Sequence, residues 1–238
     1  RERLRRCYFN EEIDRPAVYS RMGFPNDDPT YDELKAYLLA HTEQKRNWGG
    51  GVSSLPYPTE SRTEPYSEDF ARRVTTLRTE NGDFQSSFLV SLNGLPGLHE
   101  TFYLRSREDA ERYLSLPLPD PEVDVASFPE AVAAVGDTGI VDVNLGFSPG
   151  GTVAQLFGST TFAMMTLTDR DILHALCERH TTVIMNRLKV LIAGGVGPYF
   201  STAGQEFVAP PLHGPGDFYD FNVKYDKQII DLVHDAGG

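Results

Sequence analysis

The chain has few cysteines and no long apolar run. Its only two cysteines, Cys7 and Cys177, lie far apart in segments that we predict to be helical. A disulfide framework needs more cysteines at closer spacings, so we expect a reducing compartment, the cytoplasm. No apolar run approaches the ~20 residues that a membrane-spanning helix needs. We therefore predict an intracellular protein that does not enter a membrane.

Positive charge is also scarce. There are 22 Lys and Arg residues against 34 Asp and Glu residues, which gives a formal net charge of −12 at pH 7. A nucleic-acid-binding surface needs a basic stripe, and an anionic membrane attracts basic patches. The composition therefore argues against both kinds of partner and favours a small-molecule substrate.

Several signatures of catalytic and metal sites are missing as well. None of the six histidines is paired with another His, a Cys or a carboxylate at a spacing typical of zinc, so we predict no metal ligands in this segment. There is no Gly-x-Ser-x-Gly element. The turn 146–151 lacks the Gly-Lys-Ser/Thr ending of a nucleotide-binding loop. A flexible turn between strand and helix is the simpler interpretation, although its backbone N–H groups could also face an anion.

The first half of the chain contains a hairpin pattern. We predict a helix over 1–13, a short strand over 17–20 and a helix over 31–42, followed by a polar loop to about residue 65. The segments 74–79 and 84–90 then flank Asn81-Gly82, a pair that favours a type I′ turn. A further strand is expected over 99–104. A helix that begins after the cap residue Ser106 should follow.

The second half alternates strands with helices. Residues 139–145 predict a buried strand, 168–193 a long amphipathic helix and 196–201 another strand, and an amphipathic helix ends the chain. This order implies a parallel sheet, which fits a doubly wound fold or a (β/α) barrel. Only three or four strand–helix units can be counted, whereas a barrel needs eight. A barrel would therefore be incomplete.

Ligands of parallel α/β folds bind at the carboxyl ends of the strands. The residues predicted at those ends are Ser20, Arg21, Asn144, Tyr199 and Ser201. Gly146 follows Asn144 in the adjoining turn. Without a further clue, any of these residues is a candidate for ligand contact.

Three segments of the chain follow one another in a recognisable order. Asp14-Arg15-Pro16 leads into a predicted strand, residues 106–114 form a predicted helix, and Ala193-Gly194-Gly195 precedes Tyr199-Phe200-Ser201-Thr202-Ala203-Gly204. In this ordered set the sequence resembles the uroporphyrinogen decarboxylase-like superfamily, most clearly over 139–238. The resemblance covers most of the chain apart from about 45–70.

The resemblance implies a (β/α)8 TIM barrel. We therefore expect residues 1–238 to be one barrel domain, incomplete at its C-terminus, with a hairpin insertion at about 66–105. Gly237-Gly238 after the last helix would lead to a further strand. In the methyltransferase branch of the superfamily, the zinc ligands would lie beyond that point.

The family pattern is matched only in part. Decarboxylases have Arg-Gln-Ala-Gly-Arg after the first strand, whereas this chain has Arg21-Met22-Gly23-Phe24-Pro25, so only Arg21 matches. In the motif Phe-Asp-Ser-Trp-Ala-Gly, Ser201, Ala203 and Gly204 match, but Phe200 replaces the Asp. An octacarboxylate such as uroporphyrinogen needs several cations around it. The departures therefore shift our expectation toward the methyltransferase-like branch.

The leading hypothesis is an enzyme of corrinoid-linked methyl transfer, which would use zinc and a corrinoid and could work with a corrinoid protein or as a homodimer. The first alternative is a decarboxylase of uroporphyrinogen or another carboxylate, without a cofactor. The second alternative is a non-catalytic binding barrel. The resemblance assigns catalysis to Arg21 and Ser201, and substrate binding to Asn144, Tyr199 and Gly146.

Overall fold

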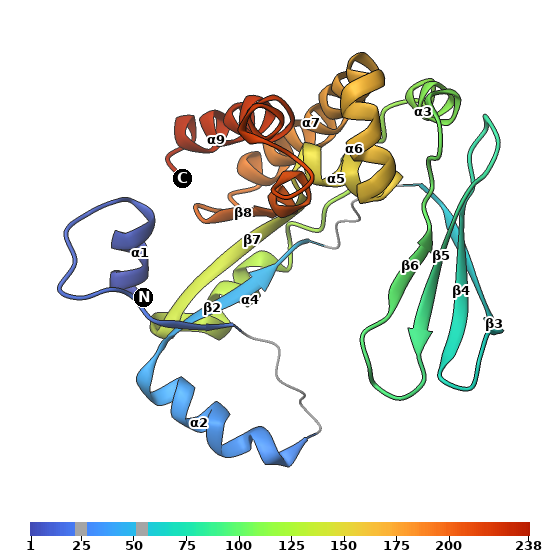
Figure 1. Ribbon diagram of the computed structural model, residues 1–238. Coiled ribbons are helices and arrows are strands. Elements are labelled where there is room, and N and C mark those ends of the chain that lie inside the picture. Colours follow the sequence, from blue (N-terminus) through green and yellow to red (C-terminus); the bar gives the residue numbers. More distant parts are fainter. Residues whose placement is uncertain (22–27, 51–56) are drawn as a thin grey trace.

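The strands form two separate sheets. The computed structural model describes residues 1–21, 28–50 and 57–238, without the side chains of Ser20 and Arg21. One sheet is parallel, in the order β1 (Tyr19–Arg21), β2 (Glu43–Trp48), β7 (Gly139–Phe147) and β8 (Phe200–Ala203). The other is an antiparallel meander of β3 (Thr59–Pro65), β4 (Phe70–Leu77), β5 (Phe84–Ser91) and β6 (Leu98–Thr101). The two sheets stand apart in Figure 1.

The expected (β/α)8 TIM barrel, incomplete at the C-terminus, is wrong. Half of the strands in the described part of the chain belong to the antiparallel sheet, so they cannot form part of a closed ring of eight parallel strands. The cause is the segment 59–101, whose strands are joined by short turns. Such connections allow only antiparallel pairing, because a parallel pair needs a crossover of a dozen or more residues.

The hairpin expected around Asn81-Gly82 is confirmed, but its turn differs from the prediction. Strands β4 and β5 pair in register from Phe70 opposite Ser91 to Leu77 opposite Phe84, so residues 78–83 connect them. A type I′ turn requires positive φ at both central residues. Gly82 has φ +96°, whereas Asn81 is not among the residues with positive φ. The longer connection therefore replaces the predicted two-residue turn.

Two strands lie in the stretch that we expected to be a loop. Both β2 and β3 have polar sequences, Glu-Gln-Lys-Arg-Asn-Trp and Thr-Glu-Ser-Arg-Thr-Glu-Pro. Strand β2 nevertheless takes a central place in the parallel sheet, between β1 and β7. Its polar residues are accommodated because one face of this sheet is lined by polar side chains.

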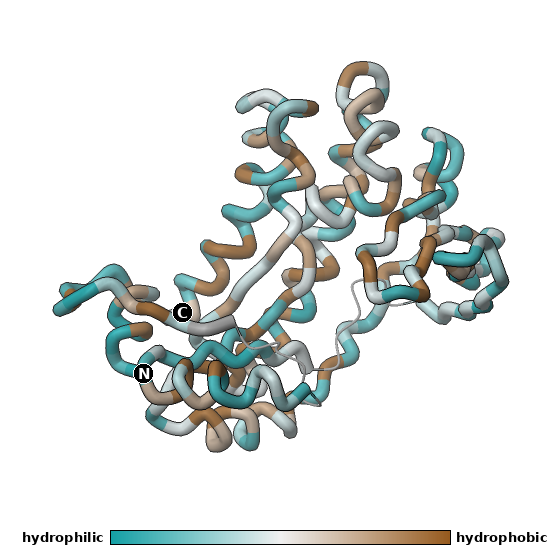
Figure 2. The backbone as a smooth tube through the Cα atoms, turned by 60° about the horizontal axis from the view of Figure 1, so that its bottom comes forward, coloured by the Kyte–Doolittle hydropathy of each residue, from teal (hydrophilic) through white to brown (hydrophobic). Residues whose placement is uncertain are grey.

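The helices surround the parallel sheet and the space between the two sheets (Figure 1). They are α1 (Glu2–Tyr8), α2 (Asp32–His41), α3 (Arg107–Leu114), α4 (Phe128–Val135), α5 (Pro149–Phe157), α6 (Ser159–Thr168), α7 (Arg170–Ala193), α8 (Pro215–Phe218) and α9 (Lys224–Asp235). Hydrophobic and hydrophilic stretches alternate along the helices in Figure 2, as expected of helices with one buried side. In the described part of the chain, none of them is long and apolar enough to cross a bilayer.

A local signal placed the start of α3 correctly. The Ser106 side chain accepts a hydrogen bond from the Asp109 backbone N–H, as predicted for the cap residue. The Asp109 carboxylate accepts one in turn from Arg105 N–H.

Helix α5 begins earlier than predicted, at Pro149 inside the expected turn 146–151. Ser148 caps it by accepting a hydrogen bond from Gly151 N–H.

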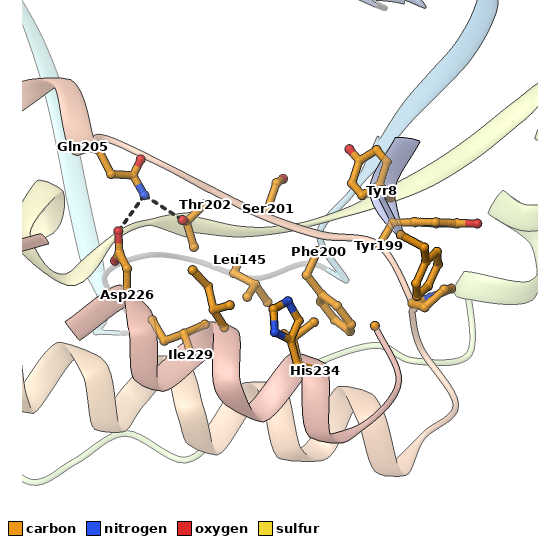
Figure 3. A pocket seen from close by; sticks show the side chains of 15 residues that line it. Tyr8, Leu145, Tyr199, Phe200, Ser201, Thr202, Gln205, Asp226, Ile229 and His234 are labelled. Atoms are coloured by element: carbon orange, nitrogen blue, oxygen red, sulfur yellow. Dashed lines mark hydrogen bonds between the residues drawn. The ribbon is translucent and has the colours of Figure 1, made fainter. Parts of the chain in front are cut away.

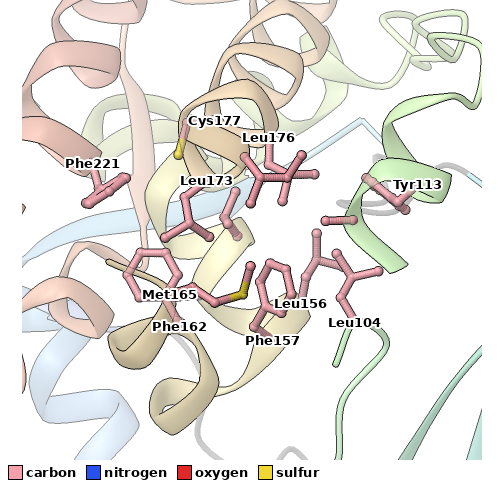
Figure 4. Packing of buried hydrophobic residues seen from close by; sticks show 14 of the residues in the cluster. Leu104, Tyr113, Leu156, Phe157, Phe162, Met165, Leu173, Leu176, Cys177 and Phe221 are labelled. Atoms are coloured by element: carbon pink, nitrogen blue, oxygen red, sulfur yellow. The ribbon is translucent and has the colours of Figure 1, made fainter. Parts of the chain in front are cut away.

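Two large apolar clusters stabilise the fold. One covers the helix-facing side of the parallel sheet and contains Val141, Val143 and Leu145 of β7. The other is centred on α5, α6 and α7 and reaches Leu77 and Phe84 of the antiparallel sheet. Figure 4 shows Phe157, Phe162, Leu173 and Leu176 of this second cluster, with Tyr113 of α3 at its edge.

Candidate functional site

The parallel sheet has one apolar and one polar face. Along β7, Val141, Val143 and Leu145 pack into the apolar cluster under the helices. Successive side chains of a strand point to opposite faces, so Asp142 and Asn144 lie on the other side. That side lines a cavity of about 440 Å³. We call it the polar-face cavity; its lining residues are Tyr19, Lys45, Asn47, Asp142, Asn144, Ser201, Thr202 and Ala203.

The polar-face cavity is of a size and composition that suit a small polar molecule. Its volume lies within the roughly 300–1,000 Å³ that is typical of small-molecule pockets. It offers a cation, a carboxylate, two amides and several hydroxyl groups, contributed by strands that run parallel. Such convergent polar groups fix the orientation of a ligand.

A chain of polar contacts crosses three strands at this cavity. The Lys45 ammonium of β2 lies 3.1 Å from Asp142 Oδ2 of β7. The Ser201 hydroxyl of β8 donates a hydrogen bond of 2.9 Å to the same oxygen. Asp142 is only 3% exposed, and its other oxygen, Oδ1, has no hydrogen-bond partner among the described residues. A buried acceptor without a donor is costly, so this oxygen is available to a ligand N–H or O–H.

Lys45 is held as a cation. Burial by itself lowers the pKa of its ammonium group, but hydrogen bonds to Tyr8 and Asp142, together with the negative charge of Asp142, raise the pKa above its ordinary value. The ammonium nitrogen also lies 5.8 Å from the Tyr8 ring centre and 5.4 Å from that of Tyr19. Rings at this distance favour the charged form. The cavity therefore holds a permanent positive charge at neutral pH.

Helix α1 covers the amino-terminal end of the polar face. Leu4 of this helix packs with Ile140 and Tyr199 in a small buried cluster. Beside it, the buried Glu43 carboxylate accepts hydrogen bonds from the Arg3 guanidinium and from Val18 N–H. Burial alone would raise the pKa of Glu43, but these contacts lower it below its ordinary value. Helix α1 thus packs on this end of the sheet through both an apolar cluster and an ion pair.

The structure brings two of the predicted site residues to the polar-face cavity. Ser201 lies there and contacts Asp142. Asn144 lines it too, although its Oδ1 accepts a hydrogen bond of 2.7 Å from Gly146 N–H. Gly146 has φ +89°, which this local turn requires, and it is absent from the lining residues. Its role is therefore to shape the chain after Asn144.

The other three predicted residues are placed differently. Tyr199 is 8% exposed and packs with Leu4 in the small buried cluster, where its ring meets that of Tyr8 edge-on at 5.2 Å. It also lines a second cavity, described below. The backbones of Ser20 and Arg21 pair with strand β2, but their side chains lie outside the described part of the structure.

Sequence reasoning missed Lys45, Asn47 and Asp142. Lys45 and Asn47 belong to the polar stretch that we expected to be a loop. Asp142 carried a usable signal, because it is the single charged residue within the apolar segment 139–147. A charged side chain in a buried strand needs a partner of opposite charge. Here that partner is Lys45 of β2, a strand that lies far from β7 in the sequence.

A second cavity of about 200 Å³ runs along β8 beside α9 (Figure 3). Its apolar wall includes Leu145, Phe200, Ile229 and Val233. At one end the Gln205 amide donates hydrogen bonds to Thr202 Oγ1 (2.9 Å) and to Asp226 Oδ2 (3.0 Å). We call this cavity the edge groove. It shares Ser201 and Thr202 with the polar-face cavity.

The remaining candidate sites have structural roles. A side chain at Gly150 would lie 2.2 Å from the Phe221 carbonyl oxygen, and one at Gly151 would lie 2.7 Å from that of Gly204. These glycines therefore allow close packing in the first turn of α5, which begins inside the segment predicted to be a turn. Cys177 is fully buried, and burial raises the pKa of its thiol. Within the ranges that the structure describes, no group of three His, Cys, Asp or Glu side chains is placed to hold a metal ion.

Comparison with family models found no match, and a search of curated proteins found no similar sequence.

Proposed function

We propose that the protein is an enzyme that decarboxylates a small molecule carrying both a carboxylate and an N–H or O–H donor. The observation that carries this proposal is the contact chain from Lys45 through Asp142 to Ser201 at the polar-face cavity. Lys45 offers a fixed positive charge to the carboxylate, and the unpaired Asp142 oxygen offers an acceptor to the donor group. The proposal agrees with the decarboxylase alternative that follows from the family resemblance.

The residues have distinct roles in this proposal. When the carbon–carbon bond to the carboxylate breaks, carbon dioxide leaves and the bonding electron pair stays on the substrate until that carbon takes up a proton from water. A cation held in place beside that charge stabilises the transition state. Ser201 is a positioning residue, since it fixes the Asp142 carboxylate that in turn holds Lys45. The Asn47 and Asn144 amides line the cavity where the rest of the substrate would lie.

Corrinoid-linked methyl transfer, with zinc and a corrinoid as cofactors, stays a prediction. The groups that line the polar-face cavity serve a carboxylated substrate more directly than a methyl donor.

The test is release of carbon dioxide from pyrrole-2-carboxylate by the wild-type chain, Lys45→Met and Lys189→Met. Lys189 is exposed on α7 and controls for the loss of one positive charge. We expect Lys45→Met to lower the rate by about 100-fold or more, because one preorganised charge contact contributes about 3 kcal/mol, and Lys189→Met to have the wild-type rate. Activity of Lys45→Met equal to that of the wild type would contradict the assigned site, and absence of release by the wild type would contradict decarboxylation of this substrate.

A further inference from the structure

A second ligand site lies outside the proposed catalytic cavity. The edge groove has an apolar wall and an acidic end, where Asp226 lies in the first turn of α9 (Figure 3). Asp226 Oδ2 accepts the hydrogen bond from Gln205, but Oδ1 is buried and has no hydrogen-bond partner among the described residues. An incompletely paired carboxylate at the end of an apolar cavity indicates a missing partner.

The charge on Asp226 is not compensated within the described residues. Burial raises the pKa of its carboxyl group, and the hydrogen bond from Gln205 offsets only part of this effect. A cation placed next to the carboxylate would remove the cost of burying the negative charge. The protein as a whole has a formal net charge of −12, which raises the local concentration of cations.

The acidic end is held in one geometry. The Gln205 amide contacts both Thr202 and Asp226, and the Gln205 backbone carbonyl accepts a hydrogen bond of 3.1 Å from the Asn222 amide. The carboxylate is thus fixed before any ligand arrives, which lowers the entropic cost of binding.

The rest of the groove suits a hydrocarbon body. Ile229 is 3% exposed and Leu145 is 1% exposed, and Phe200 and Val233 extend the same wall. Burial of apolar ligand surface against this wall favours binding.

We propose that the edge groove binds a small primary amine, whose apolar body lies against α9 and β8 and whose ammonium group pairs with Asp226. The amine site uses neither Lys45 nor Asp142, although its groove meets the polar-face cavity at Ser201 and Thr202. Lys45→Met should leave amine binding unchanged, which allows either proposal to fail alone.

The test is calorimetric titration of the chain with n-hexylammonium chloride and, for the same apolar body without charge, with hexan-1-ol. We expect the amine to bind about tenfold or more tightly than the alcohol, which is the ratio that 1.4 kcal/mol of ion pairing gives. Asp226→Asn should abolish this preference. Asp231→Asn, which removes an exposed carboxylate of the same helix that pairs with Lys227, should retain it.

A measurement on the wild-type chain tests the proposal even if the Asp226→Asn variant does not fold. Methyl NMR signals of Ile229 and Val233 should shift on addition of n-hexylammonium. Equal binding of amine and alcohol, an unchanged preference in Asp226→Asn, or methyl signals that do not move would each overturn the proposal.

Discussion

Asp142 organises the polar face because it is a buried charge with two partners on neighbouring strands. An isolated carboxylate in this position would be strongly disfavoured, but Lys45 and Ser201 both contact its Oδ2. The cost of burying Lys45 is offset by the same contact. The pKa of Lys45 is therefore kept high by its contact with Asp142.

Replacement of Asp142 by Asn should lower the pKa of Lys45. The hydrogen bond and the negative charge of Asp142 raise that pKa, so their loss leaves burial, which lowers it. NMR titration of ¹³C-dimethylated lysines, with Lys45→Arg to assign the signal, measures the shift.

The free energy of unfolding should fall at alkaline pH, because the Lys45 ammonium is then deprotonated. Because the folded-state pKa of Lys45 is raised, its contribution to the free energy of unfolding is present below the unfolded-state pKa and is lost as the pH rises through the folded-state pKa. Asp142→Asn should remove this alkaline loss. A Lys45 pKa in Asp142→Asn equal to or above that of the wild type would contradict the pairing.

At the residue scale, the sequence indicated only part of the site. Ser201 and Asn144 were predicted because strand ends can be located from the chain itself. Lys45 and Asp142 meet only because β2 pairs with β7 along Gln44–Trp48 and Gly139–Val143. That pairing joins segments almost a hundred residues apart, and no local pattern specifies it.

The pairing of β2 with β7 depends on Gly139. A side chain at this position would place its Cβ atom 1.8 Å from the Gln44 carbonyl oxygen and 2.8 Å from Gln44 Cα. Both are backbone atoms, which cannot move without shifting the strand. Only glycine allows the two strands to approach this closely at the start of β7.

We therefore expect Gly139→Ala to destabilise the protein by about 1–3 kcal/mol, the usual cost of overpacking. Gly216→Ala is the matched control, because a side chain at Gly216 of α8 meets nothing within 4 Å. It should change the free energy of unfolding by no more than about 1 kcal/mol. Urea denaturation of both variants measures the difference; equal stabilities would show that the strands are not packed as described.

At the element scale, the correct predictions are those whose sequence signals lie close together in the chain. The α3 cap and the β4–β5 hairpin were predicted because their signals lie within a few residues of each other. Strand β2 was missed because its exposed and polar-face residues, including Lys45 and Asn47, give it the composition of a loop. Its partner strands supply the hydrogen bonds that local preference does not.

On the scale of the whole molecule, the two sheets are joined through one core. Leu77 and Phe84 of the antiparallel sheet belong to the same apolar cluster as Leu173 and Leu176 of α7. Helix α7 also contributes Ile184, Leu188 and Leu191 to the cluster beneath the parallel sheet. This helix is therefore the physical link between the sheets.

Phe84→Ala should consequently weaken the parallel sheet as well. The loss of a buried phenylalanine costs about 3–5 kcal/mol. Trp48 is the only tryptophan in the chain and lies in β2, with its ring 5.0 Å from that of Phe128. In Phe84→Ala, the Trp48 fluorescence midpoint in urea should fall together with the circular dichroism midpoint. An unchanged Trp48 midpoint would mean that the sheets unfold independently.

The predicted barrel was wrong because the closure of a sheet is a property of the whole molecule. Alternation of strands and helices does predict a parallel sheet, and four such strands are present. How many strands a sheet includes, and how they close, depends on pairings between distant segments. The antiparallel strands form a sheet of their own, and their sequences alone do not reveal which sheet they join.

The most direct test of the Lys45–Asp142 site is the affinity of the chain for pyrrole-2-carboxylate relative to furan-2-carboxylate. The two probes share a ring and a carboxylate, but only the pyrrole carries an N–H that the unpaired Asp142 oxygen can accept. We predict that the pyrrole binds more tightly, that Asp142→Asn reduces the difference, and that Lys45→Met weakens both probes. Equal affinities in the wild type, or binding that survives in Lys45→Met, would contradict the site.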